Sequence, residues 1–384
     1  LIYGSNITGS YGDGVDVFGN RTTIRDSYVY GYDGYGVYIN GSYNNITDSV
    51  VKGEGYYSYG VYITGSYNNI TDTAVKSEWY GGVYIYGSYN LIYGSNITGS
   101  YGDGVYVFGN RTAIVRSNVY GHNYGVYIWG NDNNITDTHA SGYYYDGVYI
   151  TGNDNNITDT HASGYGGYGV YITGNDNVIN GSSFTGSWGD GVYIYGSYNN
   201  ITDTHASGYG GYGVYVDGNR TAIRDSYVYG YDYGVYIYGS YNLIYGSNVT
   251  SYSDYGVYIT GNHNTITGSV VKGEGCDYGV YIWGNDNTIT DTYATSEGCD
   301  YGVYIWGNHN TITGSAISGA EIGLYIWGND NTVVNSTVSH DGIGIYLYYD
   351  SSTLITGNII SNNGKYGLYM QGTRGDLIYN NLFN

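Results

Sequence analysis

The chain has 384 residues, with 67 Gly, 59 Tyr and no Pro, and 32 acidic against 11 basic side chains give it a formal net charge of −21. Such an acidic chain is expected to repel nucleic acid and anionic membrane surfaces. It contains no run of 18 apolar residues that would span a bilayer. The first residue is Leu and no signal-peptide pattern follows it, which indicates a processed or fragmentary form.

A repeat of 21 to 24 residues runs through the whole sequence. One copy is YGVYIWGNDNNITDTHASGY at residues 124–143, and its glycine recurs seventeen times between Gly14 and Gly367. A period this short predicts a solenoid in which each repeat packs on its neighbours. We therefore expect a single domain over residues 1–384 with no internal boundary.

Each repeat contains three short segments of alternating polarity, which predicts three β-strands. In the first, Val126 and Ile128 point inward on either side of Tyr127, while Ile135 and Ala140 mark the inward positions of the second and third. The Asn that ends the first turn recurs in twelve coils and is expected to form a hydrogen-bonded ladder. The pattern predicts an all-β parallel β-helix with about 17 to 18 coils of about 22 residues.

This coil pattern resembles the right-handed parallel β-helix repeats of the carbohydrate-binding and sugar-hydrolysis group along nearly the whole chain. The segment GIGIYLYYDSSTLITGNIISNNGKYGLYMQGTRGDLIYNNLFN at 342–384 is similar to the NosD-type repeats of exported bacterial and archaeal surface proteins. The resemblance implies a right-handed β-helix and an extracellular or cell-surface location. It implies no single activity, because this scaffold carries lyases, hydrolases, adhesins and structural proteins.

The outward positions of the first strand form an aromatic ribbon. With strands about 4.8 Å apart, the ribbon would be roughly 80 Å long and would offer on the order of 800 Å², the size of one side of a standard protein interface. We expect another copy of the chain to cover it, although tyrosines that only stack on each other are the alternative. The residues of this expected self-association face are Tyr38, Tyr62, Tyr84, Tyr106, Tyr127, Trp129, Tyr149, Tyr171, Tyr193, Tyr215, Tyr236, Tyr258, Tyr281, Trp283, Tyr304, Trp306, Tyr325, Trp327, Tyr346 and Tyr369.

Fourteen Asn-X-Ser/Thr acceptor sites predict N-glycans, and only Asn40 falls in the aromatic columns. Thirteen of the sites precede residue 251. Covalent sugar would therefore cover other faces and leave the aromatic ribbon bare. The sites are Asn6, Asn20, Asn40, Asn45, Asn69, Asn96, Asn110, Asn134, Asn156, Asn180, Asn200, Asn219, Asn248 and Asn335.

Cys276 and Cys299 occupy the same position of adjacent coils, in EGCDYGVYIWGN each time. Stacked strands would bring their Cα atoms to about 4.8 Å, within the range of about 4.4 to 6.8 Å that a disulfide needs. We expect a disulfide between the two coils and an oxidising compartment. Two free thiols or links to another chain are the alternatives.

Candidate chemistry is sparse in the sequence. His139 and His161 share an outward column, but no carboxylates or Cys cluster with them, so we expect no metal. Recurring Asp beside the second turn is compatible with calcium but does not indicate it. We expect no cofactor and no catalytic residues, because lyases and hydrolases need a singular cluster and no coil has a long loop to wall a cleft.

These observations favour an extracellular structural protein that is not an enzyme. It would self-assemble through the tyrosine-rich face and open solenoid ends, laterally or head to tail, into a cell-surface filament, tube, sheath or layer. The second hypothesis is a surface-displayed glycan-binding β-helix module, because aromatic ribbons also stack on sugar rings. A polysaccharide lyase or hydrolase is the third.

Overall fold

The computed structural model describes residues 1–275, 277–298 and 300–384. Cys276 and Cys299, and with them the predicted disulfide, lie outside the described residues. The chain divides into two compact units, Leu1–Tyr193 and Ile194–Asn384. A single domain over 1–384 stays a prediction, and each unit is described by itself. No helix in the described residues is long and apolar enough to cross a membrane.

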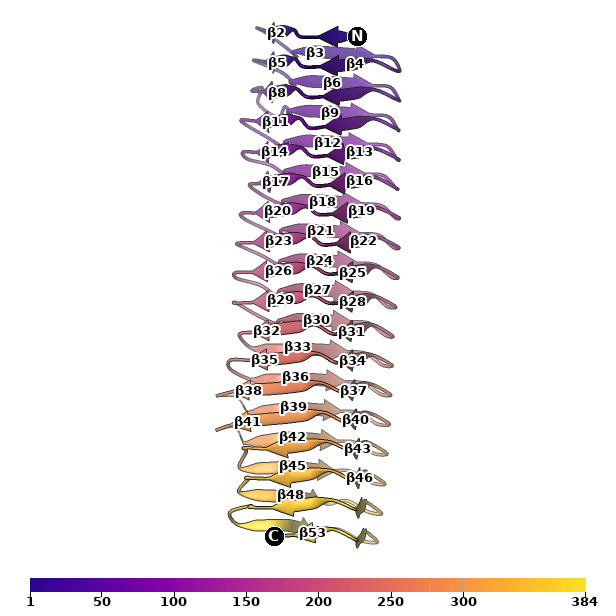
Figure 1. Cartoon of the computed structure of the whole chain (residues 1–384), viewed down its shortest axis with the longest axis vertical. Helices are drawn as coiled ribbons and strands as arrows, with labels where there is room; N and C mark the ends of the chain where they lie inside the picture. Colours follow the sequence, from indigo (N-terminus) through magenta and orange to yellow (C-terminus); the bar gives the residue numbers. More distant parts are fainter. Residues whose placement is uncertain (276, 299) are drawn as a thin grey trace. The chain divides into compact units, whose positions relative to one another are not determined.

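In each unit successive coils contribute one strand to each of three parallel sheets, as Figure 1 shows. We call them sheet C, sheet A and sheet B, in the order in which a coil visits them. The fold is the predicted right-handed parallel β-solenoid, with about 17 coils and three strands per coil. Neighbouring coils align in register, so that Tyr127 pairs with Tyr106 on one side and with Tyr149 on the other.

Sheet C holds the first strand of each coil. In unit 1 its strands are β3 (Val15–Phe18), β6 (Val37–Asn40), β9 (Val61–Thr64), β12 (Val83–Tyr86), β15 (Val105–Phe108), β18 (Val126–Trp129), β21 (Val148–Thr151) and β24 (Val170–Thr173). In unit 2 they are β30 (Val214–Asp217), β33 (Tyr233–Tyr238), β36 (Tyr255–Thr260), β39 (Tyr278–Trp283), β42 (Tyr301–Trp306), β45 (Ile322–Trp327), β48 (Ile343–Tyr348) and β51 (Tyr366–Gln371). The boundary between the units falls within β27 (Val192–Tyr195).

Sheet A holds the second strand of each coil. In unit 1 its strands are β1 (Ile2–Tyr3), β4 (Thr23–Arg25), β7 (Asn45–Thr47), β10 (Asn69–Thr71), β13 (Leu91–Tyr93), β16 (Ala113–Val115), β19 (Asn134–Thr136), β22 (Asn156–Thr158) and β25 (Val178–Asn180). In unit 2 they are β28 (Asn200–Thr202), β31 (Ala222–Arg224), β34 (Leu243–Tyr245), β37 (Thr265–Thr267), β40 (Thr288–Thr290), β43 (Thr311–Thr313), β46 (Thr332–Val334), β49 (Leu354–Thr356) and β52 (Leu377–Tyr379).

Sheet B holds the third strand of each coil. In unit 1 its strands are β2 (Asn6–Gly9), β5 (Tyr28–Gly31), β8 (Val50–Gly53), β11 (Ala74–Ser77), β14 (Asn96–Gly99), β17 (Asn118–Gly121), β20 (His139–Gly142), β23 (His161–Gly164) and β26 (Ser183–Gly186). In unit 2 they are β29 (His205–Gly208), β32 (Tyr227–Gly230), β35 (Asn248–Ser251), β38 (Val270–Glu274), β41 (Tyr293–Glu297), β44 (Ala316–Ser318), β47 (Thr337–Ser339), β50 (Ile359–Ser361) and β53 (Leu382–Phe383).

The core consists of the inward columns that the alternation predicts. Val126, Ile128, Ile135 and Ala140 are fully buried, and their equivalents are buried in the same way in the interior coils, whereas end-coil members such as Met370 and Phe383 are exposed. Because the side chains of a strand alternate between its two faces, every buried aliphatic residue leaves its neighbour on the outside. The outward positions are therefore free to carry function.

The repeated glycine stands where segments of the backbone approach one another closely. A Cβ atom at Gly125 would lie 2.5 Å from the carbonyl oxygen of Gly147 and 2.6 Å from the amide nitrogen of Ser141. Both are backbone atoms of neighbouring strands, so they cannot move away without distorting a sheet. This close approach explains why glycine recurs at the start of each sheet C strand.

The first turn contains the predicted asparagine ladder. Asn133 Nδ2 donates to Asn155 Oδ1 at 3.1 Å and to the carbonyl oxygen of Gly109 at 3.1 Å. Asn155 Oδ1 also accepts from the backbone N–H of Asn133 at 2.9 Å. Both side chains are about 1% exposed. Stacking therefore satisfies a buried polar column that an isolated coil would leave unpaired.

Candidate functional site

The outward side of sheet C carries an inner column of stacked tyrosines, which we call the tyrosine ladder. In unit 1 the rings from Tyr38 to Tyr193 lie 4.7 to 5.4 Å apart between centroids, with planes within 11° of parallel. In unit 2 the rings from Tyr215 to Tyr325 lie 4.6 to 5.1 Å apart, within 13°. Each ring face is covered by the next ring, so the ladder offers a ligand mainly ring edges and hydroxyl groups.

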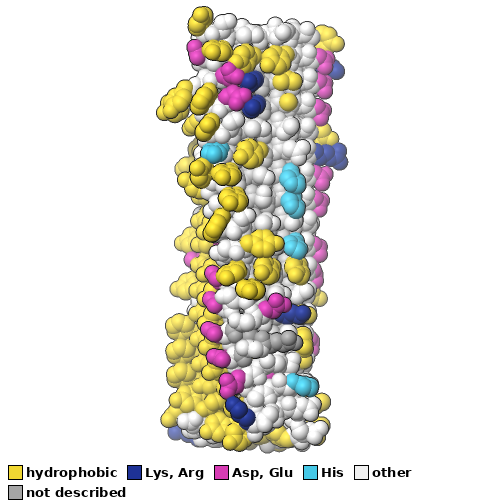
Figure 2. Space-filling model, turned by 90° about the vertical axis from the view of Figure 1, so that its left-hand side faces the viewer, with side chains coloured by type: hydrophobic (Ala, Val, Ile, Leu, Met, Phe, Trp, Pro, Cys, Tyr) yellow, Lys and Arg dark blue, Asp and Glu magenta, His cyan; other side chains and the backbone are white. Residues whose placement is uncertain are grey.

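A second column lies two residues further along each sheet C strand, and we call it the outer column. In unit 1 it runs Phe18, Asn40, Thr64, Tyr86, Phe108, Trp129, Thr151 and Thr173. In unit 2 it runs Asp217, Tyr238, Thr260, Trp283, Trp306 and Trp327. Hydrophobic side chains gather at the left edge of the view in Figure 2, the side on which sheet C lies.

Unlike the tyrosine ladder, the outer column is interrupted by small or polar side chains. Trp129 pairs in register with Phe108 on one side and with Thr151 on the other, and 52% of its surface is exposed. Tyr238 and Trp283, which flank Thr260, are 56% and 50% exposed. At Thr64, Thr151 and Thr260 an aromatic side chain therefore stands beside a hydroxyl-bearing threonine rather than beside another ring, whereas Asn40 and Asp217 interrupt the column with other polar groups.

The corner that leads into sheet C brings carboxylates close to tyrosines in unit 1. Asp146 Oδ1 accepts from the backbone N–H of Tyr168 at 2.8 Å, and Asp103 Oδ1 accepts from that of Tyr124 at 3.3 Å. Burial raises the pKa of Asp146 to about 7 and that of Asp103 to about 6, against the opposing effect of these hydrogen bonds. Carboxyl groups that hold a proton near neutral pH are suited to general acid and base catalysis.

Sequence reasoning missed these aspartates as candidate functional residues. The signal that could identify them lies at the position directly before the repeated glycine. At this position Asp and Tyr alternate along five successive coils, as Asp103, Tyr124, Asp146, Tyr168 and Asp190. The interruptions of the outer column were likewise visible in the sequence.

A polar cluster lies at the start of the sheet B strands in unit 1. His139 and His161 pair in register, as predicted, and their rings stack at 4.8 Å. With Arg116, Asp137 and Asp159 they line a shallow hollow of about 310 Å³. Arg116 already contacts Asp137 Oδ2 at 3.4 Å and donates to the Tyr93 hydroxyl at 3.0 Å. Its charge is thus partly compensated within the chain.

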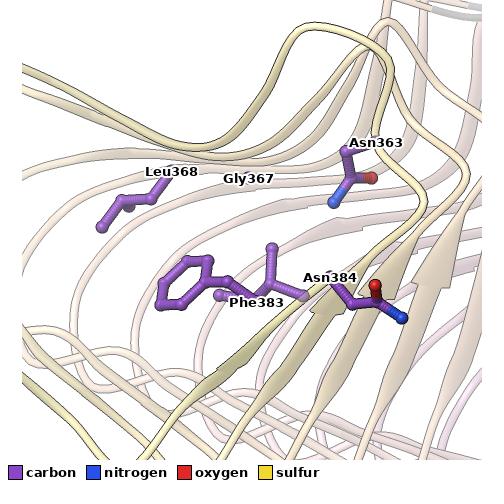
Figure 3. Close-up of a pocket in the computed structure, with 6 residues that line it drawn as sticks. Asn363, Gly367, Leu368, Phe383 and Asn384 are labelled. Carbon is purple, nitrogen blue, oxygen red and sulfur yellow. The ribbon is translucent and has the colours of Figure 1, made fainter.

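A further hollow of about 450 Å³ lies at the coil that contains β51 and β53 (Figure 3). It is lined by Ile360, Asn363, Gly367, Leu368, Phe383 and Asn384. These are apolar side chains, amides and a glycine of two neighbouring coils, and Phe383 among them is 47% exposed. None of them is titratable, and we assign the hollow no chemistry.

Two family models match the sequence. The model described as the right handed beta helix region matches residues 1–137, 59–207 and 109–242. These overlapping matches cover more than half of the chain. The chain belongs to this right-handed β-helix family. A second model, described as the periplasmic copper-binding protein NosD, matches residues 225–384. No curated protein matches the chain.

Several solved structures are similar to this β-helix protein. An alginate lyase from Paenibacillus sp. str. FPU-7 is 17% identical with a TM-score of 0.43, over 63% of this chain and 92% of that chain. The A-module of the mannuronan C-5 epimerase AlgE6 of Azotobacter vinelandii is 15% identical with a TM-score of 0.44, over 81% and 90%. The tailspike protein of E. coli bacteriophage HK620, in complex with a pentasaccharide, is 11% identical with a TM-score of 0.39, over 91% and 67%. None of these distant similarities assigns a substrate to this chain.

Two expectations from the sequence are corrected by these findings. The self-assembling structural protein and the absence of enzymatic activity are both contradicted, because the similar structures include alginate lyases, epimerases and a tailspike protein with a bound pentasaccharide, which agree better with the second hypothesis of a glycan-binding module. The stacking of the tyrosines gives a physical reason for the first correction. The tyrosines of the expected self-association face already cover one another's ring faces within the chain, so a second copy is not needed to account for the column.

The name of the second family model raises the question of copper. Within the described part of residues 225–384, the closest candidate ligands are His309 Nε2 and Asp330 Oδ2 at 3.5 Å, with Asp286 Oδ1 at 3.9 Å from His309 Nδ1. These side chains are exposed, and no group of three or more His, Cys, Asp or Glu among the described residues is arranged to hold a metal ion. The described residues therefore do not fit a copper ion.

The predicted glycosylation sites lie on several faces, and none of the fourteen asparagines is buried. Asn45, Asn69, Asn134, Asn156 and Asn200 begin sheet A strands and are half-buried, while the others are exposed. Asn40 alone stands in the outer column of sheet C. The use of these sites stays a prediction.

Proposed function

We propose that this protein is an extracellular polysaccharide-binding protein and that its ligand lies on the outward side of sheet C. The observation that carries the proposal is the outer column, where exposed aromatic side chains such as Trp129 and Trp283 stand beside threonines. An aromatic face packs against the C–H face of a sugar ring, and a threonine hydroxyl hydrogen-bonds to the sugar hydroxyls.

The form of the site suits a long chain rather than a small molecule. The outer column places one outward side chain on each coil at the spacing of adjacent strands, about 4.8 Å, so a long ligand can contact several coils. Small-molecule sites, in contrast, are concave and enclose most of their ligand. The residues of sheet C form an outward-facing surface, along which a polymer can make many weak contacts at once.

Affinity electrophoresis tests this proposal. The full chain is run through native gels that contain hydroxyethyl cellulose, glucomannan, dextran or alginate. We expect retardation in at least one gel, and a Trp129→Ala, Trp283→Ala double variant should lose most of it. Tyr245→Ala removes an aromatic side chain of similar exposure (46%) from sheet A and should bind normally. Unretarded migration in every gel, or equal retardation of the double variant, would contradict the proposal.

A second candidate function is chemical modification of the bound polysaccharide, and the paired aspartates favour it. Asp103 and Asp146 stand two coils apart, which places them about 10 Å from each other along the stack. That distance is close to the roughly 6.5 to 9.5 Å between the two carboxyl groups of inverting glycosidases. Their raised pKa values suit an acid that keeps its proton near neutral pH.

The test of this second function is a product assay on any polysaccharide that the chain binds. New reducing ends would indicate hydrolysis, and ultraviolet absorbance of an unsaturated sugar would indicate elimination. Asp146→Asn should abolish either product and leave retardation in the gel unchanged. Absence of any product from a bound polysaccharide would reject catalysis and leave the binding function standing.

An extracellular location and N-glycans at the fourteen acceptor sites form part of the proposal. Exposed or half-buried asparagines leave room for a covalent sugar, and only Asn40 would place one on the outer column. Mass spectrometry of the protein from its native source tests this. Unmodified peptides at all fourteen sites would overturn the glycan part of the proposal.

A further inference from the structure

The outer column of unit 2 is an aromatic stack with one ring missing. Trp283, Trp306 and Trp327 stack continuously, at 5.2 Å and 11° and then at 4.9 Å and 2°. On the other side of Trp283 the register partner is Thr260, and the partner beyond Thr260 is Tyr238. An aromatic side chain thus stands on each side of a single threonine.

The width of this gap follows from the spacing of the strands. Tyr238 and Trp283 are separated by two strand spacings, or about 10 Å. Within the stack, one ring occupies about half of that distance, since Trp283 and Trp306 lie 5.2 Å apart. The gap above Thr260 therefore accommodates one ring with a contact on each face. We call it the Thr260 slot, bounded by Tyr238, Thr260 and Trp283.

The side chains around the slot select the kind of ring. Tyr238 and Trp283 are about half exposed, so their surfaces are available to a ligand. Thr260 lies on the strand between Tyr238 and Trp283 and brings a hydroxyl to this position, and Tyr258 of the tyrosine ladder lies two residues away on the same strand. Apolar walls with a hydroxyl between them match a sugar ring, which has C–H groups on its faces and hydroxyls on its rim.

The charges around the slot indicate whether it binds an uncharged sugar or a negatively charged uronate. In unit 2 the described strands of sheet C contain one carboxylate, Asp217, and no Lys or Arg. Asp232, Asp254, Asp277 and Asp300 precede β33, β36, β39 and β42 at the corner that leads into the sheet. The whole chain carries a formal charge of −21. A polyanion such as alginate would meet repulsion here without a basic partner in the sheet.

We propose that the Thr260 slot binds one ring of an uncharged polysaccharide, held between Tyr238 and Trp283. This inference rests on the proposed function, because it places one sugar of the bound chain. It also assigns this protein a ligand class that differs from the polyuronates named for several of the similar structures.

Filling the slot tests the inference. Thr260→Tyr restores the missing ring and leaves the fold intact, because tyrosine already occupies this position in other coils, as at Tyr238. The matched control is Thr267→Tyr, which adds the same side chain to the outward side of sheet A in the same coil, at a threonine of similar exposure. Dissociation constants are measured for hydroxyethyl cellulose, glucomannan and dextran, with alginate as the polyanion.

We expect Thr260→Tyr to weaken binding of the preferred uncharged polysaccharide by about tenfold, the loss of roughly one aromatic stacking contact. Thr267→Tyr should bind like the parent, and alginate should bind worse than the uncharged polymers at low salt. Equal binding by Thr260→Tyr and the parent would overturn the slot and leave the proposed function intact. Preference for alginate would overturn the uncharged class. Failure of the parent to bind any of the four polymers would overturn the proposed function itself.

Discussion

The Oδ1 atom of Asp146 accepts a hydrogen bond of 2.8 Å from the backbone N–H of Tyr168, one coil further along unit 1. This bond favours the ionised carboxylate, but burial outweighs it and raises the pKa from 3.8 to about 7. The folded chain therefore binds this proton more tightly than the unfolded chain. The resulting stabilisation is complete below about pH 4 and is lost as the pH rises through about 7.

We predict from this sign that Asp146→Asn stabilises the protein at pH 8 and has little effect at pH 4. The amide keeps an oxygen for the Tyr168 N–H and removes the cost of a buried charge. The gain at pH 8 should be up to about 4 kcal/mol, at about 1.4 kcal/mol for each pKa unit. Urea unfolding at the two pH values measures it. Asp154→Asn, at an exposed turn position, is the control and should give no such difference. A gain that is equal at both pH values would argue against a buried, protonated Asp146.

A second prediction concerns the repeated glycine. Gly125→Ala should cost about 1 to 3 kcal/mol or more, because the new Cβ would meet the backbone of two neighbouring strands. Gly12→Ala is the matched control, since a Cβ there would meet nothing within 4 Å. Thermal unfolding followed by circular dichroism compares the two. Similar melting temperatures would show that the coils tolerate a side chain at this corner.

The asparagine ladder yields a third prediction. Asn155→Ala removes the acceptor of two hydrogen bonds from Asn133 and leaves buried donors unpaired. We expect a loss of about 2 kcal/mol or more, because an unsatisfied buried group costs about 1 to 3 kcal/mol. Thr158→Ala, on the outward side of the next strand in the same coil, should cost less than about 1 kcal/mol. Equal losses in urea unfolding would mean that the ladder contributes no more than an ordinary surface bond.

The tyrosine ladder predicts a delayed phenol titration. Burial raises the pKa of Tyr127 and Tyr281 to about 12, whereas a free tyrosine titrates near 10. Phenolate absorbance of the folded protein should therefore rise in two steps, with the exposed tyrosines first. The stabilisation from these neutral phenols is full below about pH 10 and is lost as the pH rises through about 12. The chain in strong denaturant should titrate in one step, and a single step for the folded chain would contradict a buried ladder.

The core and the turns could be predicted from sequence because their residues repeat. The same residue types recur at the positions of Ile135, Asn133 and Tyr127 in successive coils. The environment of a residue in one coil therefore predicts the environment of its equivalents in the others. Stacking in register then follows from the period alone. The predicted positions of His139 and His161 in one outward column are confirmed for the same reason.

The function was harder to predict, because it depends on what differs between coils. Whether a tyrosine ring offers its face or its edge is decided by the residue one coil away, and Thr260 matters only because Trp283 and Tyr238 flank it. The raised pKa of Asp146 depends on burial at a corner, which the one-letter pattern does not reveal. The aromatic ribbon was thus located correctly, but the self-assembling function inferred from it is contradicted.

Footprinting of aromatic side chains tests polysaccharide binding on sheet C most directly. The protein is exposed to brief hydroxyl-radical oxidation with and without the uncharged polymer that it binds best, and modified peptides are measured by mass spectrometry. Our account predicts that the polymer protects Trp129, Tyr238 and Trp283 and leaves Tyr245 on sheet A as reactive as before. Unchanged reactivity of the three sheet C residues, or protection of Tyr245 alone, would contradict it.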